Sequence, residues 1–292
     1  MELLLLGGDR RMLYTAGHLS ALGHSVRLGG FEPQPGFSGL RFVPQDAWRE
    51  AVKLSGAVVL PLFIPGREGA AVIQAPFAKE EISAAEIART VTLRQPVLAG
   101  MPPPEVRAAF FGRGLALLDY FAREELAVFN AVPTAQGVLA LLFENLESAV
   151  ANCTVCVTGY GRCARALARA LRGLGTRVVI AARKKRDLAQ IKVDGYEPLP
   201  LDRLAGAAPG FDALVNTVPA RIITAEALAA FRKGCLLIEI ASAPFGTDSA
   251  AAKALGLSYI YAPSLPGKAA PKTAGEIVAD TVDNMLSELK TG

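Results

Sequence analysis

The stretch that decides the fold of the second half is Thr154-Val-Cys-Val-Thr-Gly159-Tyr160-Gly161-Arg162-Cys163-Ala164. An apolar run typical of a strand passes into Gly-x-Gly-x-x-Ala, and a helical pattern over Cys163–Leu174 follows. In a dinucleotide-binding βαβ unit, the first Gly permits a tight turn, the second lets the backbone approach the pyrophosphate, and the third small residue allows close helix–strand packing. We therefore predict a Rossmann-type domain that binds a dinucleotide at Gly159, Tyr160, Gly161 and Arg162.

The next predicted strand, Arg177–Ala182, indicates which dinucleotide is bound. NAD sites usually place Asp or Glu at the end of this strand to hold the ribose 2′-hydroxyl. Here the strand runs into Arg183-Lys184-Lys185-Arg186, and no carboxylate occurs before Asp187. Arg183 and Lys184 are therefore predicted to meet the 2′-phosphate of NADP. The alternative is a solvated basic turn, which is how we interpret Lys185 and Arg186.

Two later segments are expected to line the cofactor because they follow strands, and ligands lie beyond the carboxyl ends of the strands in such folds. The first is Asn216-Thr217-Val218-Pro219, after a strand over Leu214–Asn216. The second is Ala241-Ser242, after a strand over Leu236–Ile240.

The first half also alternates buried strand patterns with helices, which predicts a second parallel sheet. Its first strand, Leu3–Leu6, leads into Gly7-Gly8, but Met12 occupies the third small-residue position, so a second dinucleotide site is not expected. Asp9 and Arg11 lie at the carboxyl end of that strand, where substrates bind. An ordinary surface turn is the alternative.

The length of 292 residues suits two domains. We predict an α/β fold with an N-terminal substrate or partner domain over 1–133, a linking helix over 134–150 and an NADP-binding Rossmann domain over 151–274. A C-terminal helix over 275–292 is expected to pack back toward the first domain. Pro133 and Thr134 suit the start of the linking helix.

Composition narrows the classes of protein. The net charge of +4 comes from basic residues mostly dispersed among acidic ones, so no nucleic-acid surface is predicted. The apolar runs are short or interrupted, which predicts neither a signal peptide nor a membrane span.

Cys153 and Cys156 form a C-x-x-C, but they lie in a strand pattern and no second ligand pair follows, so we interpret them as core residues and predict no metal site. Neither His18 nor His24 has an acidic neighbour, which disfavours a His–acid catalytic pair.

The segment 263–275, Pro-Ser-Leu-Pro-Gly-Lys-Ala-Ala-Pro-Lys-Thr-Ala-Gly, is predicted to be a loop that opens the last helix. Lys268 and Lys272 can attract an anionic substrate or the cofactor phosphates. The alternative is a rigid connector with solvated lysines.

Over nearly its whole length the chain resembles the family of dipicolinate synthase A subunits. The run from Leu265-Pro266-Gly267 through Ala270-Pro271-Lys272-Thr273-Ala274-Gly275 is its most specific feature. The other residues that carry the resemblance are Gly7-Gly8-Asp9 with Arg11, Pro133-Thr134-Ala135-Gln136-Gly137, Gly159-Tyr160-Gly161-Arg162, Ala182-Arg183, Asn216-Thr217-Val218-Pro219, and Ala241-Ser242 with Gly246-Thr247-Asp248. The chain departs from the pattern at Gln136, where an acidic residue is expected, and at Phe245, where Gly is expected.

The resemblance implies oxidation of a heterocyclic dicarboxylate, derived from 4-hydroxy-tetrahydrodipicolinate, to dipicolinate, with NADP+ as hydride acceptor. It also implies that the partner is the smaller, flavoprotein-like B subunit of dipicolinate synthase, and that the setting is the cytoplasm of a sporulating mother cell. We further expect a homo-oligomeric core.

On this hypothesis the two substrate carboxylates need cations in a cleft between the domains, and Arg11, Lys268 and Lys272 are the candidates. Asp9 is the candidate proton acceptor, and Thr134 and Ser242 can position the substrate or nicotinamide through their hydroxyls. Two alternatives stay open: an NADP-dependent dehydrogenase of a shikimate-type substrate, for which Lys53 and Lys79 lack a matching Asp motif, and a non-catalytic NADP-binding subunit.

Overall fold

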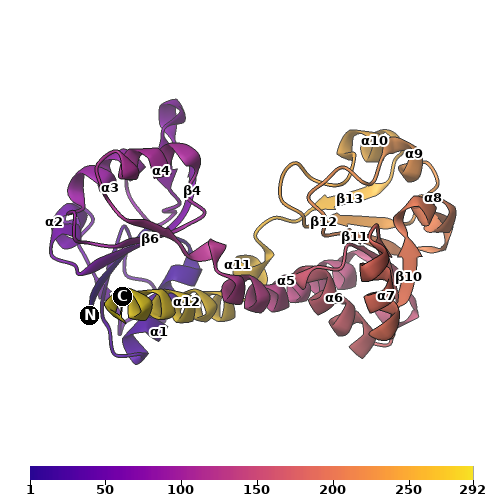
Figure 1. Cartoon of the computed structure of the whole chain (residues 1–292), viewed down its shortest axis with the longest axis horizontal. Helices are drawn as coiled ribbons and strands as arrows, with labels where there is room; N and C mark the ends of the chain where they lie inside the picture. The colour runs from indigo at the N-terminus through magenta and orange to yellow at the C-terminus, as the bar shows by residue number, and fades with distance from the viewer. Residues whose placement is uncertain (292) are drawn as a thin grey trace. The chain divides into compact units, whose positions relative to one another are not determined.

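The computed structural model describes residues 1–291 except for the side chain of Glu68, and the chain forms two compact units (Figure 1). Unit 1 comprises Met1–Asn130 together with the C-terminal segment that begins at Pro271, and unit 2 comprises Ala131–Ala270. Each unit is built around one sheet with helices on its two faces, so the predicted α/β class is confirmed.

The sheet of unit 1 has the order β3-β2-β1-β4-β6-β7, and these strands are parallel; β5 pairs antiparallel with the end of β4. Its strands are β1 (Glu2–Leu6), β2 (Ser25–Gly29), β3 (Arg41–Phe42), β4 (Ala57–Pro65), β5 (Ala71–Ile73), β6 (Val97–Gly100) and β7 (Leu117–Asp119). Leu3 and Leu5 point into one core and Leu4 and Leu6 into the other, and all four are fully buried. A strand buried on both faces explains the unbroken leucine run.

The helices of unit 1 cover the two faces of this sheet. They are α1 (Arg10–Ala21), α2 (Trp48–Lys53), α3 (Ala84–Thr90), α4 (Pro104–Phe111) and α12 (Pro271–Thr291), with the 3-10 turns η1 (Arg67–Gly69) and η2 (Tyr120–Ala122). The long C-terminal helix α12 runs beside α1 (Figure 1).

Close packing and polar contacts hold α12 on α1. The buried side chains of Val278, Val282 and Leu286 join the unit 1 core, and each contributes roughly 1.5–3 kcal/mol. Gly275 allows the close approach, because a Cβ there would lie 2.4 Å from the carbonyl oxygen of Arg11. The Nε2 atoms of His18 and His24 lie 2.7 Å from the carboxylates of Asp280 and Asp283, respectively.

Unit 2 repeats the strand order of a doubly wound sheet: β10-β9-β8-β11-β12-β13, all parallel. Its strands are β8 (Thr154–Thr158), β9 (Arg177–Ala182), β10 (Glu197–Pro200), β11 (Ala213–Asn216), β12 (Leu236–Glu239) and β13 (Ser258–Tyr261). Its helices are α6 (Arg162–Gly173), α7 (Lys185–Val193), α8 (Leu204–Ala207), α9 (Ala225–Leu228), α10 (Ser249–Ala254) and α11 (Leu265–Ala269), with η3 (Val150–Asn152), η4 (Leu201–Arg203) and η5 (Ala208–Gly210).

Helix α5 (Glu124–Asn145) links the two units and begins ten residues earlier than the predicted start at Thr134. The prediction that Pro133 opens the helix is wrong: Pro133 lies inside it, and Glu124 and Glu125 form the acidic first turn that favours a helix N-terminus. By length and apolar composition α5 is the one helix in residues 1–291 able to cross a membrane. Leu126 packs in the core of unit 1, and Val138 and Leu142 pack in that of unit 2, as in a helix of a globular core.

The predicted loop over 263–275 is also wrong. The segment contains α11 and the first turn of α12, which are separated only at Ala270. Ser264, the N-cap of α11, adopts a left-handed conformation (φ 58°), so the extended chain of β13 turns there and α11 begins at the next residue. Gly137 of α5 accommodates α11, because a Cβ there would lie 2.9 Å from the Cβ of Leu265.

Candidate functional site

The glycine turn of unit 2 has the backbone that the sequence motif predicts. Gly159 has a φ of +83°, and its N–H donates to the carbonyl of Ala181 at 2.8 Å. A Cβ at Gly159 would lie 2.7 Å from Cγ2 of Val218, so only glycine fits without displacing the loop after β11. Gly161 is the N-cap of α6, and Ala164 is fully buried against the sheet. The α6 N-terminus therefore presents its amides at the carboxyl end of β8, as a phosphate site requires.

A pocket of about 240 Å³ lies beside this turn. Its walls are Gly159, Ala181, Ala182, Arg183, Lys184, Asp187, Leu201, Val218, Ala220 and Ile222. The structure thus brings together the glycine turn, the cations after β9 and the loop after β11. Arg183 and Lys184 are exposed, and neither forms an ion pair with any residue in 1–291. Arg186, in contrast, does not line the pocket and pairs with Asp187 at 3.2 Å.

Tyr160 ties the glycine turn to the helix that follows β9. Its hydroxyl donates to Asp194, the residue that ends α7, at 2.5 Å. The guanidinium of Arg165 lies 4.7 Å from the ring centroid, a cation–π distance. Burial, and then the Asp194 hydrogen bond, raise the pKa of Tyr160, while the Tyr160 and Gln190 hydrogen bonds lower the pKa of Asp194. The side chain of Tyr160 therefore supports the turn, and a ligand would meet its backbone.

The side chains of Asn216 and Thr217 form hydrogen bonds within unit 2, and the expectation that their loop lines the cofactor stays a prediction. Asn216 is fully buried, and its amide accepts from Thr158 Oγ1 and from Val218 N while donating to Val218 O and Glu239 Oε1. Thr217 Oγ1 donates to the carbonyl of Thr158 at 2.7 Å. The two residues shape the loop, whereas Val218 lines the pocket and Pro219 is exposed.

Glu239 is the residue of this region that the sequence reasoning missed. It ends β12, is fully buried, and accepts four hydrogen bonds. The signal in the sequence is a carboxylate inside the apolar run Leu236-Leu-Ile-Glu-Ile240, where an unpaired charge would be costly.

The hydroxyl candidates of unit 2 have different surroundings. Thr134 is half-buried on α5 and hydrogen-bonds the Cys163 thiol at the start of α6. Ser242 is exposed after β12, and its carbonyl accepts from Phe245 N at 3.0 Å. Phe245 has a φ of +62°, the left-handed region that favours glycine, which accounts for the glycine expected there. Gln136, the other departure, is exposed on α5.

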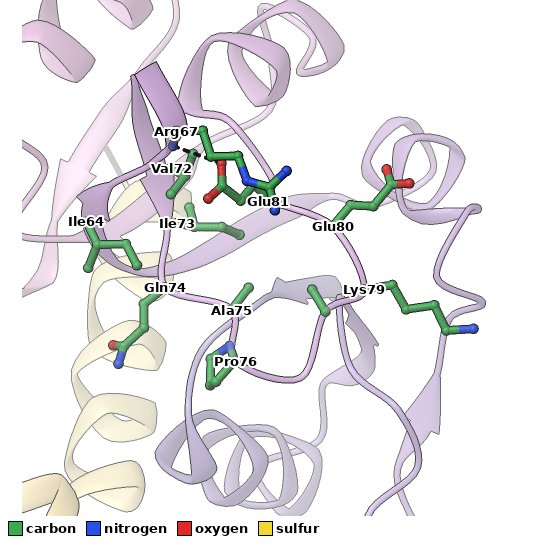
Figure 2. A pocket seen from close by; sticks show the side chains of 11 residues that line it. Ile64, Arg67, Val72, Ile73, Gln74, Ala75, Pro76, Lys79, Glu80 and Glu81 are labelled. Atoms are coloured by element: carbon green, nitrogen blue, oxygen red, sulfur yellow. Dashed lines mark hydrogen bonds between the residues drawn. The ribbon is translucent and has the colours of Figure 1, made fainter. Parts of the chain in front are cut away.

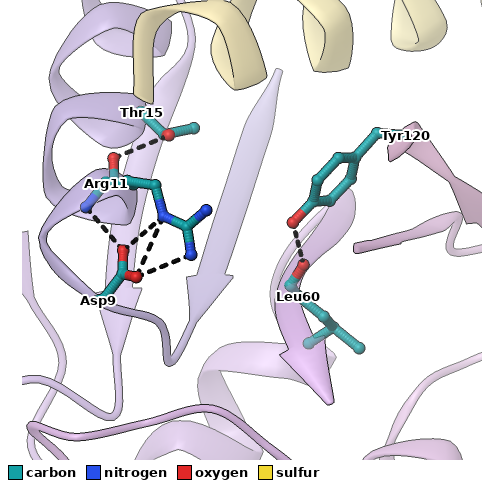
Figure 3. Close-up of polar contacts among 5 residues, drawn as sticks. All are labelled: Asp9, Arg11, Thr15, Leu60 and Tyr120. Carbon is teal, nitrogen blue, oxygen red and sulfur yellow. Dashed lines mark hydrogen bonds and ion pairs between the residues drawn. The ribbon is translucent and has the colours of Figure 1, made fainter. Parts of the chain in front are cut away.

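In unit 1, Asp9 and Arg11 form a paired unit after β1 (Figure 3). Asp9 caps α1 by accepting from Arg11 N at 3.0 Å, and it also accepts from Arg11 Nε and Nη2 at 2.9 and 2.8 Å. The Arg11 side chain is only 14% exposed, and Nη1 has no hydrogen-bond partner among the described residues. Burial depresses the pKa of Arg11, but the Asp9 contacts outweigh it, so the net shift is upward. Arg11 is therefore a fixed cation with one open donor.

Tyr120 lies across from this pair in Figure 3, and both border a cavity of about 20 Å³ that has room for about one water molecule. The Tyr120 hydroxyl donates to Leu60 O at 2.9 Å, and burial raises its pKa. Strands β1 and β4 are neighbours although β2 follows β1 in the chain, so this is the topological switch point of the sheet, where ligands bind in such folds.

A larger pocket of about 680 Å³ is lined by residues of the segment 64–81 (Figure 2). Gly8 N donates to the carbonyl of Gln74, and Gln74 lines the pocket together with Arg67, Lys79 and Glu81. The charges around it are mixed: Glu81 accepts from Arg67 N at 3.1 Å, and Glu80 lies beside Lys79. No sequence motif indicates this pocket.

Lys268 and Lys272 are exposed, Lys268 on α11 and Lys272 on the first turn of α12. The ammonium of Lys272 lies 3.8 Å from Glu276, one turn further along the helix. The four cysteines are free. Cys153 and Cys156 pack in the cores on opposite faces of the unit 2 sheet, which confirms their interpretation as core residues. Among the side chains that the structure describes, no three of His, Cys, Asp or Glu form a group able to hold a metal ion.

Comparisons with known proteins agree with this geometry. Residues 2–121 match the family model of the N-terminal domain of the dipicolinate synthase A subunit, and residues 141–262 match "D-isomer specific 2-hydroxyacid dehydrogenase, NAD binding domain". The crystal structure of the dipicolinate synthase A subunit from Bacillus halodurans is 30% identical, with a TM-score of 0.87 and 97% coverage of both chains. The chain belongs to the family of dipicolinate synthase A subunits.

Two further members of the family match along the whole chain. The dipicolinate synthase A subunit from Bacillus subtilis is 28% identical over 292 residues, which is 99% of this chain and 97% of the relative. The crystal structure of the Bacillus subtilis A chain has a TM-score of 0.86, with 27% identity and coverage of 100% of this chain and 97% of that one. With the dinucleotide domain of unit 2, membership of the family makes the protein an oxidoreductase that uses a nicotinamide dinucleotide.

Proposed function

We propose that this protein is the NADP-dependent subunit of a dipicolinate synthase, and that it oxidises a dihydrodipicolinate formed from 4-hydroxy-tetrahydrodipicolinate. The observation that carries the proposal is the whole-length similarity to the A subunits of that enzyme, combined with unpaired cations beside the glycine turn. A small dicarboxylate is then the substrate, and the setting is the cytoplasm of a sporulating mother cell.

The choice of NADP over NAD rests on Arg183 and Lys184. They border the pocket beside Gly159, at the end of β9, where an NAD site would carry a carboxylate. Asp187 lines the same pocket but is engaged by Arg186, so its charge is partly compensated. Arg183 offers the planar fork that recognises a phosphate, and Lys184 adds a point charge.

The reaction balances without a metal or another oxidant. Loss of water from 4-hydroxy-tetrahydrodipicolinate gives a dihydrodipicolinate, and loss of a hydride and a proton gives the aromatic dipicolinate. NADP+ supplies the hydride acceptor when it is bound. Aromatisation provides driving force, so the protein chiefly has to bind, orient and accept a proton.

The chain offers cations and hydroxyls for these tasks. We propose that Arg11 binds one substrate carboxylate through its open Nη1, held in place by Asp9, and that Lys268 and Lys272 contribute to anion binding. Asp9 remains the proposed proton acceptor, although its oxygens already accept from Arg11. Thr134 and Ser242 are proposed to position the substrate or nicotinamide.

The proposed partner is the flavoprotein-like B subunit of dipicolinate synthase, and the proposed core is a homo-oligomer of this chain. The name of the relatives supports a multi-subunit enzyme, since each is one subunit of dipicolinate synthase.

The test mixes the chain with NADP+ and freshly generated 4-hydroxy-tetrahydrodipicolinate, with and without the candidate partner, and follows dipicolinate absorbance together with NADPH formation. We expect equimolar dipicolinate and NADPH. If neither dipicolinate nor NADPH forms in the two mixtures although the chain binds NADP+, the proposed substrate is contradicted. The shikimate-type dehydrogenase and the non-catalytic subunit would then be the alternatives to test.

Arg11 and Lys272 are tested in the same assay. Arg11→Ala and Lys272→Ala should each raise KM for the substrate, by about tenfold for Arg11, because a charge-assisted hydrogen bond to a carboxylate is worth roughly 1.5 kcal/mol. Lys290→Ala, on the last turn of α12, is the matched control for loss of a lysine. Unchanged turnover and KM in both variants would remove these residues from the substrate site.

A further inference from the structure

The carboxylate of Glu239 lies under the two loops at the carboxyl ends of β11 and β12. Its Oε1 accepts from Asn216 Nδ2 at 2.7 Å and from Ala241 N at 3.0 Å. Its Oε2 accepts from Gly246 N at 3.1 Å and from Thr247 N at 2.9 Å. The residue is 0% exposed, and both oxygens act purely as acceptors, as a carboxylate does.

Asn216 extends these contacts to the strand that carries the glycine turn. Its side-chain oxygen accepts from Thr158 Oγ1, and Thr158 directly precedes Gly159. Its side-chain nitrogen donates to Val218 O at 3.0 Å as well as to Glu239. One buried polar chain therefore spans the ends of β8, β11 and β12, which are neighbours in the sheet.

Gly246 shows how closely the two loops approach each other. A Cβ at this position would lie 2.2 Å from Asn216 Nδ2 and 2.7 Å from Val218 O. Neither atom can move freely, because one is hydrogen-bonded and buried and the other is backbone. Ile222 N and Ile223 N also donate to Gly246 O, which locks the loop 241–247 to the segment after β11.

We infer that Glu239 is the positioning residue for the nicotinamide half of the cofactor, acting through these two loops. This inference rests on the proposed binding of a dinucleotide in unit 2. In such sheets the two halves of the dinucleotide lie on either side of the first strand, here β8. The cations after β9 mark the adenosine side. The loop after β11 borders both sides, because Val218 and Ile222 line the pocket at Arg183, whereas the loop 241–247 after β12 belongs to the nicotinamide side. The loop 241–247 contributes no residue to the pocket at Arg183.

The geometry makes a specific prediction for Glu239→Gln. A glutamine amide has one oxygen and one NH2 group, so whichever way it is turned, its NH2 group faces two N–H donors. Those two buried donors lose their acceptor, and the loops must shift to find others. Most residues that line the pocket beside Gly159 and Arg183 lie outside these two loops.

The experiment compares the binding affinity of the whole cofactor with that of its adenosine half. NADP+ and 2′,5′-ADP, which carries only the adenosine half and its 2′-phosphate, are each titrated into the wild-type and Glu239→Gln proteins by calorimetry. We expect at least about tenfold weaker binding of NADP+ and a severalfold smaller loss for 2′,5′-ADP, because the loop 241–247 lines only the nicotinamide side and the loop after β11 is shared by both ligands.

Two further variants keep the test decisive. Gly246→Ala displaces the same loop without removing the charge, and it should give the same selective loss even where Glu239→Gln fails to fold. Thr176→Val is the matched control: it removes one buried hydrogen bond, to Val150 O, at the start of β9 rather than at the carboxyl ends. It should change neither ligand's affinity.

The outcomes separate the inference from the function on which it rests. Equal weakening of both ligands, or of neither, in the folded Glu239→Gln protein, or in Gly246→Ala where Glu239→Gln does not fold, overturns the role of Glu239 while leaving cofactor binding intact. A wild-type chain that prefers NAD+ overturns the choice of NADP, and the same comparison then runs with NAD+ and 5′-AMP. A wild-type chain that binds no dinucleotide overturns both.

Discussion

The two sheets of this protein have the same order of parallel strands, but the turns that follow their first strands differ in the residues that meet an anion. In each, the first strand lies beside the fourth parallel strand of a doubly wound order, and a glycine with positive φ follows it: Gly7 at +73° and Gly159 at +83°. In unit 1 the helix that follows is capped by the Asp9 carboxylate. In unit 2 the N-cap of the helix is Gly161, which has no side chain to supply a capping hydrogen bond.

This difference explains why one turn suits a dinucleotide phosphate and the other does not. A helix N-terminus attracts an anion, and Asp9 supplies that anion from within the chain. Met12 then fills the place where Ala164 lies in unit 2, and a Cβ on Gly8 would lie 2.2 Å from its Cγ. With its own carboxylate in place, the unit 1 turn fixes Arg11 with Nη1 open, and we propose that a substrate carboxylate binds there. The same backbone topology thus serves a phosphate in one unit and, we propose, a carboxylate in the other.

The largest expected effect comes from adding a methyl group to each turn. Gly159→Ala should weaken NADP+ binding by roughly 30- to 100-fold, since its Cβ would collide with Val218 and its positive φ would be strained. Gly8→Ala is strained as well, and we expect it to destabilise unit 1 by about 1–3 kcal/mol without changing NADP+ affinity. Calorimetric titration and urea denaturation of both variants provide the measurement. Comparable loss of NADP+ binding in both would break the distinction between the turns.

The next effect concerns the cations after β9. Arg183→Ala should weaken NADP+ binding by about 10- to 30-fold and leave NAD+ binding unchanged, because a charge-assisted contact to the 2′-phosphate is lost. Lys185→Ala, which removes an exposed lysine of the same basic run that does not line the pocket, should change either affinity by less than about twofold. Fluorescence titration with NADPH and NADH measures both. A parallel loss of NADPH and NADH affinity in Arg183→Ala would speak against a 2′-phosphate contact.

The smallest expected effect concerns the Asp9 carboxylate, which caps α1 in unit 1. Asp9→Ala should lower the free energy of unfolding by about 1–2 kcal/mol, because α1 loses its cap and the part-buried Arg11 loses its partner. Asp248→Ala is the matched control, since Asp248 caps α10 but its ion-pair partner Arg221 is 68% exposed and 3.6 Å away. Urea denaturation should show the larger loss for Asp9→Ala. An equal loss would mean that the Arg11 pair adds nothing to the cap.

Local sequence patterns were enough to predict the parallel sheets, the glycine turn and the cysteines of the core. Each depends on a short run: the leucines of β1, the spacing from Gly159 to Ala164, and the apolar neighbours of Cys153 and Cys156. The strand Glu197–Pro200 was missed because two of its four residues are proline, which is tolerated only at a sheet edge, where β10 lies.

Features that depend on distant contacts could not be read from the sequence. Pro133 resembles a helix start, but the helix continues through it with core contacts on both sides. The hydrogen bond from the Asn216 amide to Glu239, 23 residues later, depends on the pairing of β11 with β12 and has no local signal in the sequence. Arg11 was recognised as a cation, but its fixed geometry depends on the cap that Asp9 provides.

The most direct test of the account is the affinity of the wild-type chain for NADPH and for NADH, measured by fluorescence titration under one set of salt conditions. The open α6 N-terminus and the unpaired Arg183 and Lys184 predict that NADPH binds at least about tenfold more tightly than NADH. Equal affinities, or tighter binding of NADH, would contradict the assignment of these cations to a 2′-phosphate.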